Sequence, residues 1–131
     1  SSVGARVRLA VMSFGFKYGV PLDADFVADM RFLPNPFWIP ELRSLSGLDA
    51  AVSSYVLDQV GAREFLERAT AMFEPVIDGY VREGRRYATI AIGCTGGKHR
   101  SVAVTEALAP MLAGDGHRVV TFVVHRDLGR E

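Results

Sequence analysis

A glycine-rich, basic segment at residues 93–101 (GCTGGKHRS) lies between an apolar run and a helix-like pattern. Residues 88–92 (ATIAI) predict a buried strand before it, and the spacing of apolar residues over 102–113 predicts a helix after it. The first amides of a helix have no intrahelical partner, and glycines let loop amides turn toward an anion. Three consecutive basic residues, 98–100, add positive charge at the same place. The segment therefore predicts a cradle for a phosphate-sized anion.

Composition and length indicate one globular domain spanning residues 1–131. Hydrophobic residues make up 49% of the chain, which is enough for a folded core. The 15 basic and 15 acidic residues balance, so the overall charge gives no preference for nucleic acid. Cys94 is the single cysteine, and no pair among the three histidines has metal-ligand spacing, so we expect no disulfide, metal or cofactor. We expect a cytoplasmic protein without membrane association, because no secretion signal or apolar run of about 18 residues is evident.

The periodicity of apolar residues predicts an α/β fold. The predicted strands are 6–14, 26–32, 87–92 and 118–124. The predicted helical segments are 48–59, 65–81 with Gly84 as its stop, and 101–113. Pro75 is expected to kink or split the second helix, and the proline-rich residues 34–45 predict an ordered, aromatic-rich loop. The final strand–helix–strand order implies a parallel pair, so we expect a small, mainly parallel sheet of about four strands flanked by helices.

Three loops follow predicted strands, at 14–19, 31–36 and 94–100. Ligands of open α/β sheets bind beyond the carboxyl ends of the strands, so these loops are expected to form the phosphate-binding edge. Their candidate ligand contacts are Ser13, Lys17, Arg31, Asn35, Thr95, His99 and Arg100, with Gly96 and Gly97 in the cradle. The aromatic residues near these loops are expected to pack in the core rather than stack on a ligand: Phe14, Phe16, Phe37 and Trp38.

The spacing around Cys94 also fits an enzyme. Five residues separate Cys94 from Arg100, and Ser101 follows, as in the Cys-x5-Arg-Ser/Thr loop of protein tyrosine phosphatases. In that chemistry a thiolate attacks phosphorus while the arginine holds the phosphoryl oxygens. Gly93 stands where those enzymes usually carry histidine. A general acid would also be needed, and the candidates near a loop are Asp23, Asp25 and Asp29. The competing interpretation of Cys94 is a small buried hydrophobic residue, so a phosphatase-like enzyme stays as an alternative.

Several motifs together resemble one known family. They stand in the family's order and approximate spacing at 13–19 (SFGFKYG), 23–25 (DAD), 29–36 (DMRFLPNP), 46–49 (SGLD) and 91–102 (AIGCTGGKHRSV). The chain is similar to the C-terminal domain of the RapZ/YvcJ family, the RNase adapter or nucleotide-binding protein family. The resemblance covers almost the whole chain.

The resemblance implies a sensing module of a longer protein. It implies an N-terminal P-loop domain that binds and hydrolyses ATP and GTP, self-association, and a link to cell-envelope precursor metabolism. The module itself would be no enzyme and would bind an amino-sugar phosphate such as glucosamine-6-phosphate, or a UDP-amino sugar. Thr95, Gly96, Gly97 and Arg100 would hold phosphate, with Lys17 as a second cation, and Ser13, Arg31, Asn35 and His99 would reach sugar hydroxyls or a second phosphate. Phe14, Gly15, Tyr18 and Cys94 complete the implied ligand site.

Two departures from the enteric members bear on the ligand and on RNA. Tyr18 stands where those members have histidine, and residues 126–131 include acids where they have a basic tail. RNA binding needs neutralisation of phosphates by basic side chains. We therefore expect a non-enteric member that senses UDP-N-acetylglucosamine or a related metabolite. The RNA-adapter alternative would use Lys98, His99, Arg100, Arg126 and Arg130.

Overall fold

The computed structural model describes residues 6–130 and has four strands in one parallel sheet. The strands are β1 (Val7–Gly15), β2 (Phe26–Asp29), β3 (Tyr87–Cys94) and β4 (Val119–His125), in the spatial order β2-β3-β1-β4. All pairings are parallel, which confirms the predicted α/β class. β1 lies between β3 and β4, so the last strand–helix–strand unit joins two parallel strands that are not neighbours.

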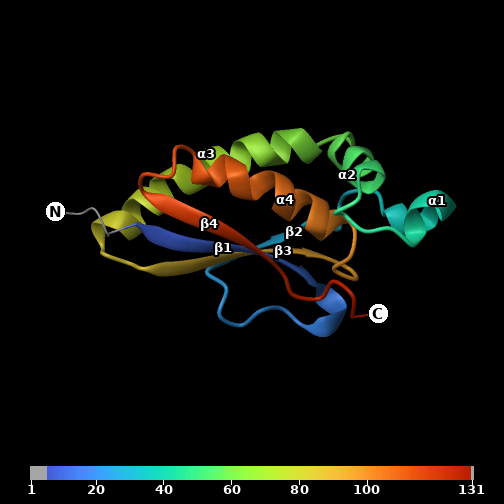
Figure 1. Cartoon of the computed structure of the whole chain (residues 1–131), viewed down its shortest axis with the longest axis horizontal. Helices are drawn as coiled ribbons and strands as arrows, with labels where there is room; N and C mark the ends of the chain where they lie inside the picture. Colours follow the sequence, from blue (N-terminus) through green and yellow to red (C-terminus); the bar gives the residue numbers. More distant parts are fainter. Residues whose placement is uncertain (1–5, 131) are drawn as a thin grey trace.

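The helices cover one face of the sheet (Figure 1). The main ones are α2 (Ala50–Leu57), α3 (Ala62–Arg82) and α4 (Arg100–Ala113). The short ones are η1 (Phe16–Tyr18), η2 (Pro36–Trp38) and α1 (Pro40–Arg43). The segment between η1 and β2 passes over the opposite face, and α1 lies at the end of the molecule where β1 and β3 finish (Figure 1). Among residues 6–130 no helix has the length and apolar character needed to cross a membrane.

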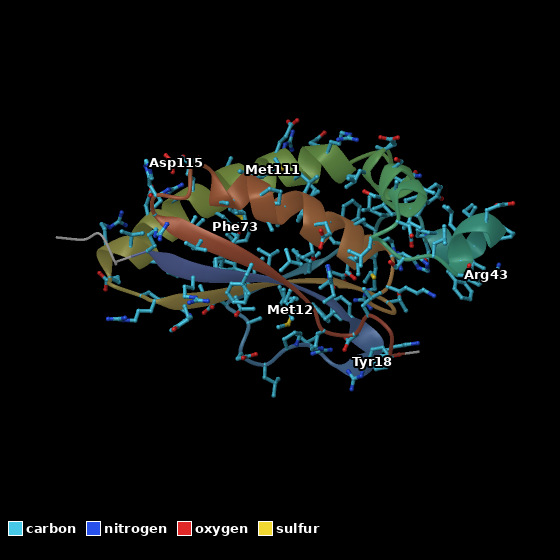
Figure 2. The ribbon with its side chains drawn as sticks, viewed as in Figure 1. Met12, Tyr18, Arg43, Phe73, Met111 and Asp115 are labelled. Carbon is cyan, nitrogen blue, oxygen red and sulfur yellow. The ribbon has the colours of Figure 1, made fainter. Side chains whose placement is uncertain are left out.

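The core forms between the sheet and the helices because each element buries one face. Along β1, Val7, Leu9 and Val11 are fully buried toward the helices, and Met12 points to the other face (Figure 2). The buried residues of α3 recur every three or four positions, as a helix with one apolar stripe requires: Ala62, Leu66, Ala69, Phe73 and Ile77. Because the apolar pattern follows the period of each element, the sequence specifies which face is buried.

Pro75 does not split α3, which runs unbroken from Ala62 to Arg82. A proline inside a helix leaves the carbonyl four residues earlier without its usual donor. That residue, Ala71, and Pro75 itself are both exposed, so water can solvate the freed carbonyl. The helix then ends as predicted: Gly84 has φ +68°, its N–H donates to Val81, and the next amide donates to Tyr80.

Two predicted segments differ from the structure near the site. β2 covers only residues 26–29, because the chain turns where the Asp29 carboxylate accepts a hydrogen bond from the Arg31 amide at 3.0 Å. The segment 34–45, expected to be a loop, contains η2 and α1. Asn35 caps η2 by accepting from the Phe37 amide at 3.1 Å, and prolines occupy the first position of both short helices, where a missing N–H costs nothing.

Candidate functional site

The loops after β1 and β3 touch through their backbones. Gly15 is paired with Cys94 in the sheet, and the Lys17 amide donates to the Thr95 carbonyl at 3.2 Å. A Cβ added at Gly15 would lie 2.5 Å from the carbonyl carbon of Gly96, and one added at Gly97 would lie 2.7 Å from the Gly15 nitrogen. Gly97 also has φ +77°, which side-chain-bearing residues rarely adopt. Glycine at these positions therefore brings the loop at 94–99 against the first loop.

Arg100 starts α4 and carries a buried, incompletely satisfied charge. The residue is 4% exposed, and its Nη1 donates to the carbonyls of Leu33 (2.9 Å) and Arg31 (3.2 Å). Its Nη2 donates to Thr95 Oγ1 at 3.3 Å, and the buried Nε has no partner. Within residues 6–130 no carboxylate forms an ion pair with this guanidinium. Neutral acceptors do not cancel a buried charge, so this guanidinium is electrostatically suited to bind an anion.

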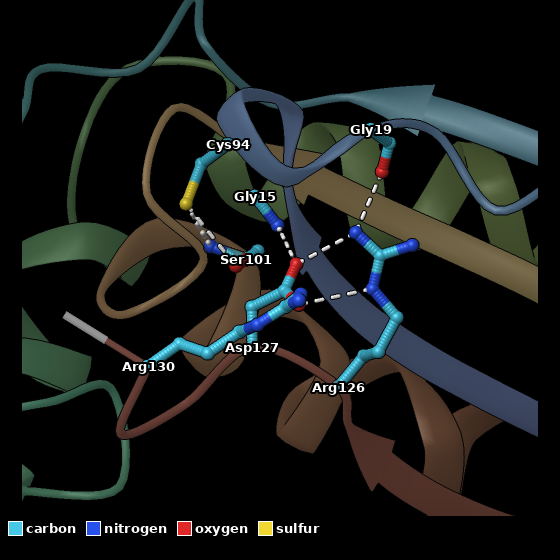
Figure 3. Close-up of polar contacts among 7 residues, drawn as sticks. All are labelled: Gly15, Gly19, Cys94, Ser101, Arg126, Asp127 and Arg130. Atoms are coloured by element: carbon cyan, nitrogen blue, oxygen red, sulfur yellow. Dashed lines mark hydrogen bonds and ion pairs between the residues drawn. The ribbon is translucent and has the colours of Figure 1, made fainter.

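Cys94 closes the end of β3 onto the start of α4. Its thiol donates to Ser101 Oγ at 3.1 Å, and its sulfur accepts from the Ser101 amide at 3.3 Å (Figure 3). Cys94 is 2% exposed and Ser101 is fully buried. The pair therefore fixes the turn between strand and helix. The same two Ser101 groups would also stabilise a thiolate.

His99 lies against the α1 segment, and the pKa of its imidazole is shifted below the ordinary value. Burial lowers its imidazole pKa, Lys98 adds repulsion, and the hydrogen bond to the Arg43 carbonyl opposes both. Nε2 lies 3.2 Å from that carbonyl, which can only accept, so Nε2 carries the proton. Nδ1 of the neutral ring is then an acceptor, suited to a hydroxyl or amide of a ligand.

These loops enclose a cavity of about 480 Å³, within the range of small-molecule sites. Its lining is Lys17, Asn35, Phe37, Trp38, Arg43, Ser44, Cys94, Thr95, Gly96, Lys98, His99 and Arg100. Four of these side chains are basic, and none of the described lining residues is acidic. The cavity is thus electrostatically suited to an anion, and its volume exceeds what inorganic phosphate needs.

Phe37 and Trp38 form an exposed aromatic edge of the cavity. Their rings meet edge to face with centroids 5.1 Å apart, and they are 44% and 71% exposed. The Arg43 guanidinium lies 4.9 Å from the Phe37 ring centroid, and its Nε donates to the Phe37 carbonyl at 2.7 Å. Arg43 therefore holds Phe37 in place, and both rings stay partly exposed at the edge of the cavity.

The buried carboxylate of Asp127 supports the loop after β1. Asp127 is fully buried, and its oxygens accept from the Gly15 amide (2.8 Å), Arg126 (2.8 Å) and Arg130 (2.7 Å) (Figure 3). Burial alone would raise the pKa of Asp127, but the hydrogen bonds and charges of these partners outweigh it and lower that pKa. Arg126 also donates to the Gly19 carbonyl at 2.6 Å, at the far end of the same loop. The chain after β4 thus holds the loop after β1.

Comparison with known families decides what kind of domain this is. The family model described as the RapZ C-terminal domain matches residues 7–129, which is nearly the whole chain. The chain belongs to the RapZ C-terminal domain family.

Longer relatives carry the same RapZ domain. A nucleotide-binding protein of Streptomyces coelicolor is 63% identical over 95% of this chain and 41% of its own length. One from Clavibacter michiganensis subsp. michiganensis is 66% identical over 97% of this chain and 43% of its own length. One from Frankia alni is 61% identical over 96% and 43%, respectively. The chain therefore spans about two-fifths of the length of these curated relatives.

The structure of this RapZ domain brings seven of the thirteen predicted ligand residues to the cavity lining. They are Lys17, Asn35, Cys94, Thr95, Gly96, His99 and Arg100. Six do not line it: Ser13, Phe14, Gly15, Tyr18, Arg31 and Gly97. The loops converge as predicted because the carboxyl ends of β1, β2 and β3 are adjacent at one sheet edge.

Each residue outside the lining has another contact. Ser13 is fully buried and hydrogen-bonds His125 Nδ1 at 2.7 Å, and the Gly15 amide is taken by Asp127. Arg31 forms an ion pair with Asp29 at 2.7 Å and lies over the Phe16 ring. The remaining three are described by their packing: Phe14 is buried against Phe16, Tyr18 lies under Lys17 and Arg130, and Gly97 backs onto the first loop.

The predicted core role of Phe37 and Trp38 is wrong, because both line the cavity. Arg43, Ser44 and Lys98 are further lining residues that the predicted set omits. One feature of the sequence could have indicated that Phe37 and Trp38 are exposed. Prolines at 34, 36 and 40 prevent a long amphipathic helix, so this segment has no regular apolar face to bury.

Proposed function

We propose that the cavity binds a phosphorylated amino sugar or a UDP-amino sugar, and that the domain senses this ligand for a longer protein. The observation that carries the proposal is the buried Arg100 guanidinium, which has a free Nε and no carboxylate partner among the described residues. A phosphate would neutralise this charge and accept from the fork of the guanidinium. The start of α4 adds the positive end of a helix dipole at the same point.

Other lining residues suit the rest of such a ligand. Lys17 and Lys98 supply further positive charge for a diphosphate, and Asn35 and neutral His99 offer hydrogen bonds for hydroxyl or amide groups. A free ammonium on the sugar would meet basic side chains and no acidic one among the described lining residues. This favours an N-acetylated amino sugar such as UDP-N-acetylglucosamine over glucosamine-6-phosphate.

We further propose the setting in which the domain acts. The relatives are named nucleotide-binding proteins and extend well beyond this domain, which supports an N-terminal ATP- and GTP-binding P-loop domain as its partner. In this proposal the domain itself is not an enzyme, the protein is cytoplasmic, and copies of it self-associate. The output concerns the supply of cell-envelope precursors.

Calorimetric titration of the 131-residue chain tests the ligand proposal. UDP-N-acetylglucosamine and glucosamine-6-phosphate are titrated separately into the wild type and into Arg100→Ala. Loss of a buried charged contact is expected to cost on the order of 2–5 kcal/mol of binding free energy. Arg100→Lys, which keeps a charge but not the fork, should recover part of it, and the exposed Arg63→Ala should bind as the wild type does. Equal affinity in Arg100→Ala contradicts the assignment.

A second candidate function is phosphoryl transfer by Cys94. The observation in its favour is the pair of Ser101 groups that contact the sulfur. Turnover of a simple aryl phosphate, abolished in Cys94→Ser, would support it. Ligand binding without turnover would exclude it.

The charges of the basic side chains give less support to RNA binding than to the binding of a phosphorylated sugar. Arg126 and Arg130, two of the five residues expected to contact RNA, both have their charge paired with Asp127. Affinity for RNA that falls steeply with salt would support this role, and affinity insensitive to salt would contradict it.

A further inference from the structure

We infer that Trp38, supported by Phe37, is a stacking platform for the nucleobase of a nucleoside diphosphate ligand. The inference rests on the proposed function, since the diphosphate would lie at Arg100 in the same cavity. It assigns a place in the cavity to the nucleobase of the nucleotide-linked sugar that the proposed function favours. Three features of the aromatic edge support it: its exposure, its fixed geometry and the chemistry of its neighbours.

Trp38 is a strongly exposed aromatic residue, and it borders the cavity. Its 71% exposure is on a cavity wall, and the ring of Phe37 beside it is 44% exposed. Single exposed apolar residues are common on protein surfaces. Two adjacent aromatic rings at the edge of a basic cavity are typical of a binding surface instead.

Hydrogen bonds fix the backbone that carries the platform. Asn35 caps η2 through the Phe37 amide, and Arg43 holds the Phe37 carbonyl from the other side. Proline at position 36 restricts the backbone at the start of the same turn. A surface already ordered in the free protein loses little conformational entropy on binding, which favours stacking affinity.

The neighbours of Trp38 favour a base over a sugar ring. Phe37 offers its ring, and the Arg43 guanidinium stacked on it offers a second flat, cationic surface. Any nucleobase can stack one of its flat faces on such surfaces, and it needs no hydrogen bond from them. Sugar hydroxyls do need such bonds, and neither of the two aromatic rings can supply one through its side chain's flat face.

The single tryptophan makes the test direct, because Trp38 alone accounts for the tryptophan fluorescence. The wild-type chain is titrated with inorganic phosphate, glucosamine-6-phosphate, uridine diphosphate and UDP-N-acetylglucosamine. We expect the two uridine compounds to quench the fluorescence with saturation. Phosphate and glucosamine-6-phosphate should bind in calorimetry without that quenching.

Variants separate stacking from phosphate binding. In calorimetry, Trp38→Ala should lower uridine diphosphate affinity by about 5- to 150-fold and leave phosphate affinity unchanged. Trp38→Tyr should retain most of the affinity. Tyr87→Ala is the matched control, because Tyr87 is also an exposed aromatic residue (63%) and lies outside the cavity.

The outcomes distinguish this inference from the function on which it rests. Undiminished uridine diphosphate affinity in Trp38→Ala overturns the platform while leaving the phosphate site intact. Equal dependence of glucosamine-6-phosphate on Trp38 also overturns it, because the contact would then be to the sugar. Failure of the wild type to bind phosphate or any of the phosphorylated ligands refutes the proposed function itself.

Discussion

The backbone amide of Gly15 donates a 2.8 Å hydrogen bond to the buried carboxylate of Asp127, 112 residues away along the chain. The contact joins the loop after β1 to the segment after β4. Gly15 in turn lies against Gly96 of the loop at 94–99, the cradle of the proposed anion site. The position of the cradle therefore depends on a carboxylate that does not itself line the cavity.

We expect Asp127→Asn to destabilise the domain by about 2 kcal/mol, because it weakens hydrogen bonds between a buried charge and three donors. Urea unfolding at neutral pH measures the change. The control is Asp58→Asn, which removes an exposed ion pair with Arg63 and should cost under about 1 kcal/mol. Equal stability of the wild type and Asp127→Asn would contradict a structural role for the carboxylate.

The acid sensitivity of the domain should depend on the same residue. The pKa of Asp127 is lower in the folded state than its ordinary value of 3.8, so its contribution is fully present above that value. The contribution is lost as the pH falls from 3.8 through the folded-state pKa. Acid unfolding curves should therefore be shallower in this region for Asp127→Asn. Parallel curves for the two proteins would refute the linkage.

Gly15→Ala should weaken both stability and anion binding. The backbone of Gly15 is ordinary extended structure (φ −107°), so the obstacle is space: the new Cβ would lie 2.5 Å from the Gly96 backbone. Such overpacking typically costs about 1–3 kcal/mol and would push the two loops apart. Thermal unfolding and phosphate titration measure the two effects.

Gly79→Ala is the matched control for that substitution. Gly79 lies inside α3, and an added Cβ would meet only the end of the Arg82 side chain at 3.5 Å. Alanine there should stabilise the helix by about 0.5–1 kcal/mol and leave phosphate binding unchanged. Similar effects of the two substitutions would mean that the loop contact is unimportant.

His99 should make the domain less stable as the pH falls below its ordinary imidazole value. Burial, the largest cause, lowers the pKa of His99 from 6.5, so the unfolded chain binds a proton more readily than the folded one. The free energy of unfolding should then decrease as the pH falls from about 6.5 toward the folded-state pKa. His99→Gln should flatten this dependence, whereas exposed His117→Gln should not. Identical pH profiles for all three proteins would contradict the prediction.

The thiol of Cys94 should react slowly in the folded protein. It is 2% exposed and bonded to Ser101, so a thiol reagent is expected to modify it at least about tenfold more slowly than in the urea-unfolded chain. Saturating phosphate should not accelerate the reaction. A native thiol that reacts as fast as the unfolded one would argue for the phosphatase alternative.

Much of the fold was predictable because local patterns repeat with the period of each element. The four strands, the long stripe of α3 and its glycine stop agree with the structure to within a few residues. The continuity of α3 through Pro75 was not predictable, since it depends on the solvent exposure of Ala71 and Pro75. The order of the strands in the sheet could not be predicted from local sequence patterns either. β1 lies between β3 and β4, and this depends on contacts between segments distant along the chain.

The candidate site was predictable where one loop contains most of it. The segment at 94–100 supplies Cys94, Thr95, Gly96, His99 and Arg100 to the cavity, as well as Lys98, because strand and helix place it at the sheet edge. Ser13 does not line the cavity, since strand alternation directs it to the buried side, where it meets His125. The aromatic edge was missed because exposure of Trp38 is a property of the folded surface.

The sequence by itself determined the α/β architecture, the basic glycine loop between strand and helix, and the family to which the domain belongs. These features reside in short-range periodicity and in contiguous motifs. Only the tertiary structure decided that Arg100 forms no ion pair with a carboxylate among residues 6–130, that Asp127 holds Gly15, and that Trp38 borders the cavity. Each of these depends on how segments distant along the chain pack together, and packing distributes burial and hydrogen bonds in ways that local sequence does not specify.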